Sequence, residues 1–290
     1  MLDGGLSNAL EDRGHDLSDV LWTARLLRDA PEEIAAVHRA YYRAGARVAT
    51  TASYQASVPG FVEAGMDRSE AERLVARSVA IAREVRDRVA DDGKERWVAA
   101  SVGPYGAVLA DGSEYRGRYG IQQSRLREFH RTRLELLADA GPDLLAVETI
   151  PDTDEAEVLV EILHELGLPA WFSFSILGQR TRAGQPLDEA FAVAGSADCV
   201  QVVGVNCCDP ADVLPAVRLA VEVTGRPAVA YPNSGEVWDA EHRRWQGGSS
   251  YDVRLASDWV RAGAAYVGGC CRVGPSTIEA LAAEVRSPDG

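Results

Sequence analysis

Long hydrophobic runs are missing from this chain of 290 residues. No apolar stretch approaches the roughly 20 residues that a membrane-spanning helix requires. The N-terminus also lacks a basic segment followed by an apolar one, which is the pattern of a secretory signal. We therefore expect a protein that neither crosses a membrane nor is secreted.

Basic residues are scarce relative to acidic ones. The chain has 30 lysines and arginines against 44 aspartates and glutamates, which gives a formal net charge of -14. Nucleic acids and anionic membrane surfaces repel such a protein, so we expect neither as a partner. Solenoid-type repeats, a Gly-rich nucleotide-binding fingerprint and a zinc-protease helix motif are also missing from the sequence.

Cysteines are few, and their arrangement argues against disulfide bonds. The chain has five, an odd number, and four of them form two adjacent pairs, which is poor disulfide geometry. This usage fits a reducing compartment, and we predict a cytoplasmic protein. Clustered cysteines in that compartment more often bind a metal or take part in catalysis.

Strand-like and helix-like segments alternate along the whole chain. The candidate strands are the short Leu2 segment, Arg47–Thr51, Trp97–Val102, Leu144–Val147, Ala170–Ile176, Cys199–Val205, Ala228–Tyr231 and Ala264–Val267. Eight such units predict a single-domain α/β fold, a (β/α)8 TIM barrel over residues 1–286, followed by a tail at 287–290. A doubly wound open sheet is the alternative.

Helical patterns fill the gaps between these strands. Leu74, Ile81 and Val85 share one face of a stretch whose other positions are mostly charged, which predicts an amphipathic helix. Asp152 and Glu155 have the spacing of an N-terminal capping pair. The five histidines, His130 among them, fall in helical or loop stretches, where we expect surface or packing roles.

Two connections are longer than the usual βα loop of two to six residues. They run from Asp3 to Pro31 and from Tyr105 to Gln122, and both contain aromatic side chains. Long loops at the C-terminal mouth of a barrel commonly build its functional site. We therefore expect both loops to border the site.

Four cysteines lie just past the C-terminal ends of two of the predicted strands. Cys207 and Cys208 follow the sixth strand, and Cys270 and Cys271 follow the eighth. These strand ends lie near each other on a closed barrel, so Cys207, Cys270 and Cys271 could supply three thiolates to a zinc ion. Buried free cysteines are the alternative. Cys208 is the weaker candidate, because an alternating strand directs it away from Cys207.

A site made only of thiolates suits one kind of chemistry better than another. Three negative ligands weaken the Lewis acidity of zinc, so such a site activates water poorly. A thiol bound at the open position has a lowered pKa and is held as a nucleophilic thiolate at neutral pH. The ligand set therefore favours alkyl transfer to a thiol over hydrolysis.

Seven segments, taken in order, resemble the homocysteine S-methyltransferase family, specifically the branch that uses S-methylmethionine. They are Asp3–Leu6 with Leu21 and Trp22, Thr51–Ala56, Gly103–Gly106 with Leu109–Gly117, Glu148–Pro151, Gly204–Cys207, Tyr231–Glu236 and Gly268–Cys271. The resemblance implies a methyltransferase barrel in which Cys207, Cys270 and Cys271 bind Zn²⁺. Its substrates would be homocysteine and a sulfonium methyl donor, S-methylmethionine or S-adenosylmethionine, and its product methionine.

The resemblance also implies roles for residues at other strand ends. Asp3 and Glu148 would bind the amino group of homocysteine, and backbone amides near Gly4 and Gly5 its carboxylate. From position alone, Asp3 could equally be a turn residue and Glu148 a helix cap. Asn233 would orient the site or complete the zinc shell.

Aromatic residues of the loops are candidates for the donor site. Trp22, Tyr54 and Tyr115 could face the sulfonium through cation–π contacts worth about 0.5–2 kcal/mol, although loop packing is the alternative for each. The family's relatives usually carry several residues before the Asp3 motif, so we expect a short first strand.

Other functions stay open from the sequence. The acceptor could be selenocysteine or another thiol or selenol, and betaine is a further possible donor. A phosphate-binding barrel isomerase or aldolase would leave Cys270 and Cys271 without a purpose. A non-catalytic zinc or redox-sensing barrel would use the paired cysteines as switches.

Overall fold

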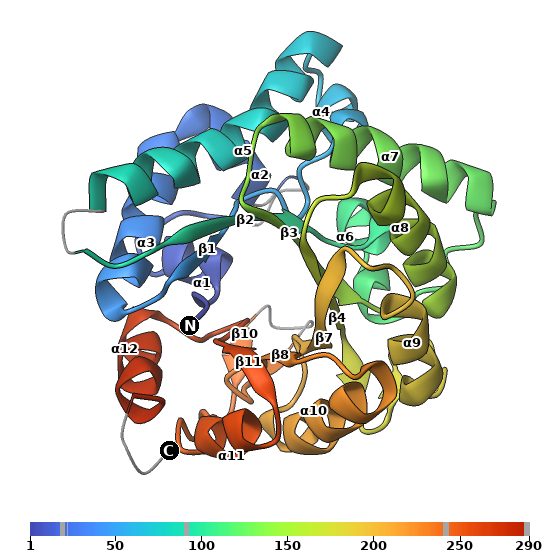
Figure 1. Ribbon diagram of the computed structural model, residues 1–290. Helices are drawn as coiled ribbons and strands as arrows, with labels where there is room; N and C mark the ends of the chain where they lie inside the picture. Colours follow the sequence, from blue (N-terminus) through green and yellow to red (C-terminus); the bar gives the residue numbers. More distant parts are fainter. Residues whose placement is uncertain (18–20, 22, 90–92, 240–243, 287–290) are drawn as a thin grey trace.

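A parallel sheet curled into a barrel forms the centre of the protein (Figure 1). The computed structural model describes residues 1–17, 21, 23–89, 93–239 and 244–286. Neighbouring strands follow the order β1-β2-β3-β4-β7-β8-β11, and every pair is parallel. The barrel strands are β1 (Val48–Thr50), β2 (Trp97–Val102), β3 (Leu144–Ile150), β4 (Ala170–Phe174), β7 (Val200–Asn206), β8 (Ala228–Tyr231) and β11 (Ala264–Val267).

The N-terminal segment joins the two edges of this sheet. The amide of Leu2 donates to the carbonyl of Val267 in β11 at 2.8 Å, and the amide of Arg47, just before β1, donates to the carbonyl of Met1 at 2.8 Å. Residues 1–3 therefore occupy the place of the first barrel strand, although they are too short for a regular one. The predicted (β/α)8 barrel and its short first strand are confirmed, and the open sheet is excluded.

One apolar layer fills the inside of the barrel. Its buried members come from the N-terminal segment and from six strands: Leu2, Val48, Ala99, Ala146, Trp171, Val202, Val229 and Tyr231. Tyr266 of β11 packs against this layer. The barrel is thus a packed core and not a pore, which confines ligands to its mouth.

Helices surround the strands and bury their apolar faces against them (Figure 1). In α5, Leu74, Ile81 and Val85 are all buried, as the sequence pattern predicts. The described helices are α1 (Leu6–Glu11), α2 (Thr23–Asp29), α3 (Pro31–Ala44), α4 (Val58–Glu63), α5 (Arg68–Val89), α6 (Tyr105–Leu109), the 3-10 turn η2 (Ser113–Tyr115), α7 (Gln123–Asp139), α8 (Thr153–Leu166), α9 (Leu187–Ala194), α10 (Pro210–Thr224), α11 (Leu255–Arg261) and α12 (Pro275–Glu284).

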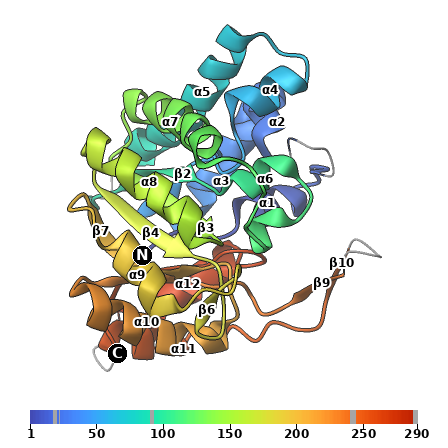
Figure 2. The same ribbon diagram turned by 90° about the vertical axis from the view of Figure 1, so that its right-hand side faces the viewer.

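The long connections contain structure of their own. The first holds α1 and α2, and the second holds α6 and η2. Two short hairpins complete the fold, β5 (Ile176–Leu177) with β6 (Arg180–Thr181), and β9 (Val237–Asp239) with β10 (Arg244–Gln246). Figure 2 shows the β9–β10 hairpin extending away from the barrel.

Two expectations about the chain as a whole have different outcomes. Among the described helices, none combines the length and apolarity needed to cross a membrane. The domain boundary at residue 286 stays a prediction, because residues 287–290 lie outside the described part of the chain.

Candidate metal centre

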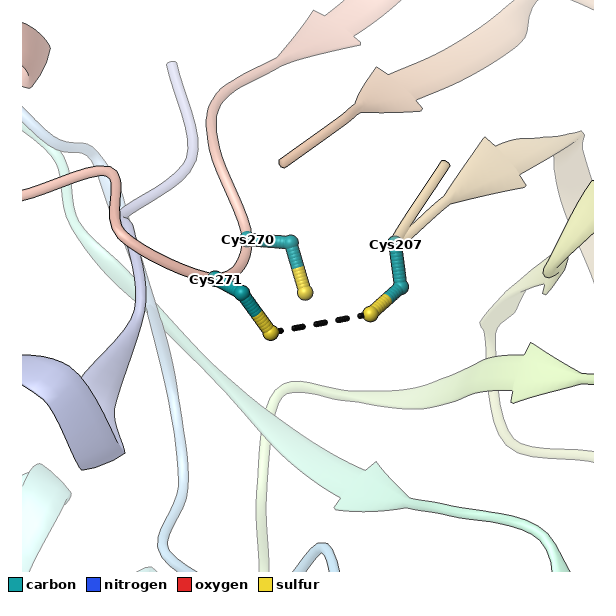
Figure 3. A group of neighbouring side chains, drawn as sticks. All are labelled: Cys207, Cys270 and Cys271. Atoms are coloured by element: carbon teal, nitrogen blue, oxygen red, sulfur yellow. Dashed lines mark hydrogen bonds between the residues drawn. The ribbon is translucent and has the colours of Figure 1, made fainter. Parts of the chain in front are cut away.

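Three thiol groups meet at the carboxyl ends of β7 and β11 (Figure 3). Cys207 directly follows β7, and Cys270 and Cys271 follow β11 after two glycines. The Sγ atoms of Cys207 and Cys271 are 3.7 Å apart, and all three Sγ atoms lie within 4.8 Å of one another. A tetrahedral zinc ion with Zn–S bonds of about 2.3 Å separates its sulfurs by about 3.8 Å. The donor set and its spacing therefore fit one such ion.

The backbone around these cysteines is held in an unusual shape. Cys207 has a φ of 51°, in the left-handed region that few residues other than glycine adopt. The amide of Cys271 donates to Oδ1 of Asn233 at 3.1 Å. At Gly269, an added Cβ would come within 2.0 Å of the Val273 side chain, so only glycine fits there. These constraints direct the thiols toward one point.

Hydrogen bonding within the cluster prepares one thiol for ionisation. Cys270 and Cys271 donate to Cys207, and the Tyr115 hydroxyl lies 3.3 Å from its Sγ atom. These bonds lower the pKa of Cys207 well below that of an ordinary thiol. Metal binding requires deprotonated cysteines, so a depressed pKa favours it.

The remaining cysteines lie outside this group. Cys208 is buried in the main apolar core, and its burial raises its thiol pKa. Cys199 immediately precedes β7, at the end of that strand opposite Cys207, and is half-buried. The placement of Cys208 agrees with its being the weaker ligand candidate.

Two carboxyl groups are buried at the mouth of the barrel, one at the end of the N-terminal segment and one near the end of β3. Asp3 accepts hydrogen bonds from the Thr50 amide at 2.7 Å and the Thr50 hydroxyl at 2.8 Å. Glu148 accepts hydrogen bonds from the hydroxyls of Ser101 and Tyr231. Burial outweighs these bonds and raises the pKa of each carboxyl group to about 7. A positively charged group bound nearby, such as an ammonium group, would stabilise the ionised form of both carboxyl groups.

A strained irregularity within β3 positions Glu148. The next residue, Thr149, has a φ of 61°, which is rare for a β-branched residue. Asn206 stabilises this backbone conformation, because its Oδ1 accepts from the Thr149 amide and its Nδ2 donates to the Thr149 hydroxyl, both at 2.7 Å. Asn206 directly precedes Cys207, so one side chain links the acidic site to the thiol cluster.

The glycines after Asp3 lie in a crowded place. An added Cβ at Gly4 would come within 2.1 Å of the Val273 carbonyl, which requires glycine. The Gly5 amide donates to the same carbonyl at 3.0 Å. Of the two amides expected to bind a carboxylate, that of Gly5 is thus already engaged, and Gly4 is the remaining candidate.

Two of the three aromatic candidates for the donor site lie near Cys207. Tyr115 reaches Cys207 with its hydroxyl, and the guanidinium of Arg182 lies 5.7 Å from its ring centroid. Tyr54 is close enough to Cys207 for that thiolate to raise the pKa of its phenol. Trp22 lies outside the described residues.

A second buried polar cluster was not foreseen. Glu155 accepts hydrogen bonds from the Tyr105 amide at 2.6 Å and the Tyr119 hydroxyl at 2.8 Å, and its Oε1 lies 2.8 Å from Nε2 of His130. Arg133 donates to the carbonyl oxygens of Tyr54 and Gly103.

This Glu155 cluster corrects the predicted capping pair. Asp152 does cap α8, since it accepts from the Asp154 amide at 3.1 Å. Glu155 instead turns inward and anchors the long loop. The sequence contains one usable signal: Glu155 lies three and four residues before Val158 and Leu159, on the apolar face of the helix.

The (β/α)8 fold and the three converging thiols at its mouth place this chain among barrel proteins whose metal centre is built from thiolates. A family model described as homocysteine S-methyltransferase matches residues 1–285. Homocysteine S-methyltransferase 4 of Zea mays is 46% identical over 100% of this chain and 90% of its own length. The Escherichia coli homocysteine S-methyltransferase is 42% identical over 98% and 94%.

A solved structure agrees with these relatives. The homocysteine methyltransferase MmuM from Escherichia coli, in its metallated form, matches with a TM-score of 0.88 and 40% identity, covering 99% of this chain and 95% of that one. The chain belongs to the homocysteine S-methyltransferase family.

Proposed function

We propose that this protein transfers a methyl group from S-methylmethionine to homocysteine, with the acceptor sulfur held on a zinc ion. The observation that carries the proposal is the convergence of Cys207, Cys270 and Cys271 in a chain of this family. Zinc held by these thiolates would leave a fourth position open and favour the thiolate form of a thiol bound there. A cytoplasmic location suits three reduced cysteines.

Asp3 and Glu148 would orient the acceptor. Asp3 ends the N-terminal segment, Glu148 lies near the end of β3, and the charge of Asp3 acts on Glu148. An ammonium group between them would offset the burial that now disfavours ionisation. The Gly4 amide would bind the carboxylate. Asn233 would keep Cys271 in place through the hydrogen bond to its amide.

Orientation would supply much of the rate. The donor methyl must lie in line between the two sulfurs, with the reacting atoms about 3–3.5 Å apart. The bond between the sulfonium sulfur and its methyl breaks as the new bond to the homocysteine sulfur forms, and the thiol proton is lost to solvent. S-Methylmethionine and homocysteine thus give two molecules of methionine and one proton.

Charge neutralisation would add to this effect. A sulfonium cation and a thiolate cancel as they react, so a site shielded from water favours the transfer. The rings of Tyr54 and Tyr115 lie beside Cys207 and would cover the reacting atoms.

The test is turnover with a matched thiolate variant. Zinc-loaded protein is incubated with homocysteine and S-methylmethionine, and methionine is quantified for the natural chain, Cys271→Ala and Cys208→Ala. We expect zinc-dependent methionine formation that Cys271→Ala abolishes and Cys208→Ala retains. Bound zinc without turnover on S-methylmethionine or S-adenosylmethionine would contradict the proposed reaction, and selenol acceptors would be tried next.

A further inference from the structure

Glu114 is a buried carboxylate with an unmatched oxygen at the barrel mouth. It lies in η2, within the long loop between β2 and α7, and only 6% of its surface is exposed. Its Oε2 atom is buried and has no hydrogen-bond partner in the described part of the chain. A buried charge without a partner is costly, so such a group is expected to have a ligand.

Other buried acids around the mouth have side-chain or backbone hydrogen-bond donors. Asp3 is bonded by Thr50, and Glu148 by Ser101. Glu155 takes the Tyr105 amide and the Tyr119 hydroxyl. The lack of a hydrogen-bond partner at Oε2 of Glu114 therefore distinguishes it from these other buried acids.

Nearby arginines are directed elsewhere. Arg182 stacks over the Tyr115 ring, and its Nε donates to the Ser175 hydroxyl at 3.3 Å. Arg116 is exposed and lies 3.9 Å from the carboxylate of Asp111. Neither supplies a counter-charge to Glu114.

Glu114 lies near the thiol cluster that would hold the metal. The next residue, Tyr115, has its hydroxyl 3.3 Å from Sγ of Cys207. The charge of Cys207 acts directly on the Glu114 carboxyl group. The loop is fixed in this place by Gly106, where an added Cβ would come within 2.5 Å of the Glu114 amide.

We propose that the Glu114 carboxylate binds the sulfonium centre of the methyl donor. The inference rests on the proposed function and assigns the donor side of the same site. The acceptor side already has two acids, whereas a donor with a positive sulfur needs a separate anion. After transfer that sulfur is a neutral thioether, so the attraction ends with the reaction. Glu114 would thus distinguish the sulfonium substrate from the product formed from it.

The test is Glu114→Gln in the zinc-loaded protein, with Asp111→Asn of the same loop as the matched exposed control. We expect the KM for S-methylmethionine to rise about tenfold or more in Glu114→Gln, because a short-range charge attraction is lost. The KM for homocysteine and the zinc content should not change, which also reports correct folding. Glu114→Ala serves as a second variant if the glutamine amide distorts the loop. An unchanged donor KM would overturn the proposal.

Methionine, used as a competing ligand, shows whether Glu114 contacts the sulfonium or the ammonium group of the donor. It carries the same ammonium and carboxylate as the donor and lacks the second S-methyl group and the positive charge that this group gives the sulfur. Its inhibition constant is measured against varied S-methylmethionine and compared with the donor KM. We expect Glu114→Gln to reduce the preference for the donor about tenfold while methionine binds as before. Equal weakening of both ligands would assign Glu114 to the ammonium group and overturn the sulfonium assignment.

The outcomes also distinguish this inference from the proposed function. If the natural protein shows no turnover, the proposed function fails before Glu114 is tested. If it turns over and Glu114→Gln behaves like Asp111→Asn, only the inference fails.

Discussion

Two buried polar regions of this barrel differ in how completely their charges are satisfied. In the Glu155 cluster, both carboxylate oxygens have partners, and Arg133 donates to two carbonyl oxygens, while its Nε atom has no hydrogen-bond partner among the described residues. At the mouth, burial raises the pKa of Asp3 and Glu148 to about 7, and Oε2 of Glu114 has no hydrogen-bond partner in the part of the chain that the structure describes. The two regions are joined through the long loop that carries Tyr105 and Glu114.

The difference separates a structural role from a binding role. A satisfied network rigidifies the fold, and loss of one member leaves the others unpaired. An unsatisfied group lowers the stability of the free protein and gains its partner only when a ligand binds. Substitutions in the first region should therefore destabilise the protein, and those in the second should stabilise it while impairing binding.

The largest effect on stability is expected for Arg133→Met. This change leaves the carbonyl oxygens of Tyr54 and Gly103 without their donor, and we expect a loss of about 4 kcal/mol in the free energy of unfolding. Arg131→Met, on the same helix but exposed and paired with Glu165, should cost less than about 1 kcal/mol. Urea denaturation measures both. Similar losses in the two variants would show that the Glu155 cluster does not anchor the fold.

Glu148→Gln should have the opposite effect on stability. The folded pKa of about 7 exceeds the ordinary value of 4.5, so the native protein holds this proton more tightly than the unfolded chain. The stability from this group is present below pH 4.5 and lost as the pH rises to 7. We expect Glu148→Gln to be more stable than the natural chain by about 3 kcal/mol at pH 8 and nearly equal to it at pH 4.5.

The same variant tests the binding role of Glu148. Its KM for homocysteine should rise while its zinc content stays unchanged, and Glu157→Gln, exposed on α8, is the control. Loss of zinc, or a stability difference independent of pH, would refute the assignment.

A smaller effect on stability is expected at His38, and its pH dependence should be opposite to that of Glu148. It is fully buried, neither ring nitrogen has a hydrogen-bond partner in the described structure, and burial lowers its pKa to about 4. The unfolded chain takes up this proton near pH 6.5, so stability falls as the pH drops from 6.5 toward 4. Relative to the natural chain, His38→Leu should gain about 2 kcal/mol at pH 5 compared with pH 8. A gain that does not depend on pH would exclude this origin.

The sequence predicts the framework well because the strands and their ends have strong local signals. Trp97–Val102, Ala228–Tyr231 and Ala264–Val267 are strands with the predicted bounds. The cysteines meet because parallel strand ends share one face of a barrel, which follows from topology alone.

The parts that could not be predicted depend on side-chain direction across the fold. Glu155 has a capping position in the sequence, yet it turns inward because Tyr105, Tyr119 and His130 converge on it. The unmatched oxygen of Glu114 becomes visible only when the loop is placed against Cys207. The helical position of Glu155 is a weak sequence signal that does not show the direction of its side chain, and Glu114 has no local pattern at all.

X-ray absorption at the zinc edge tests the central claim most directly, because it counts the sulfur ligands before and after homocysteine is added. The account predicts three sulfurs at about 2.3 Å and one lighter ligand in the resting protein, and four sulfurs with homocysteine bound. A sulfur count that does not rise when homocysteine binds would contradict the claim that the three cysteines hold an open position for the acceptor thiolate.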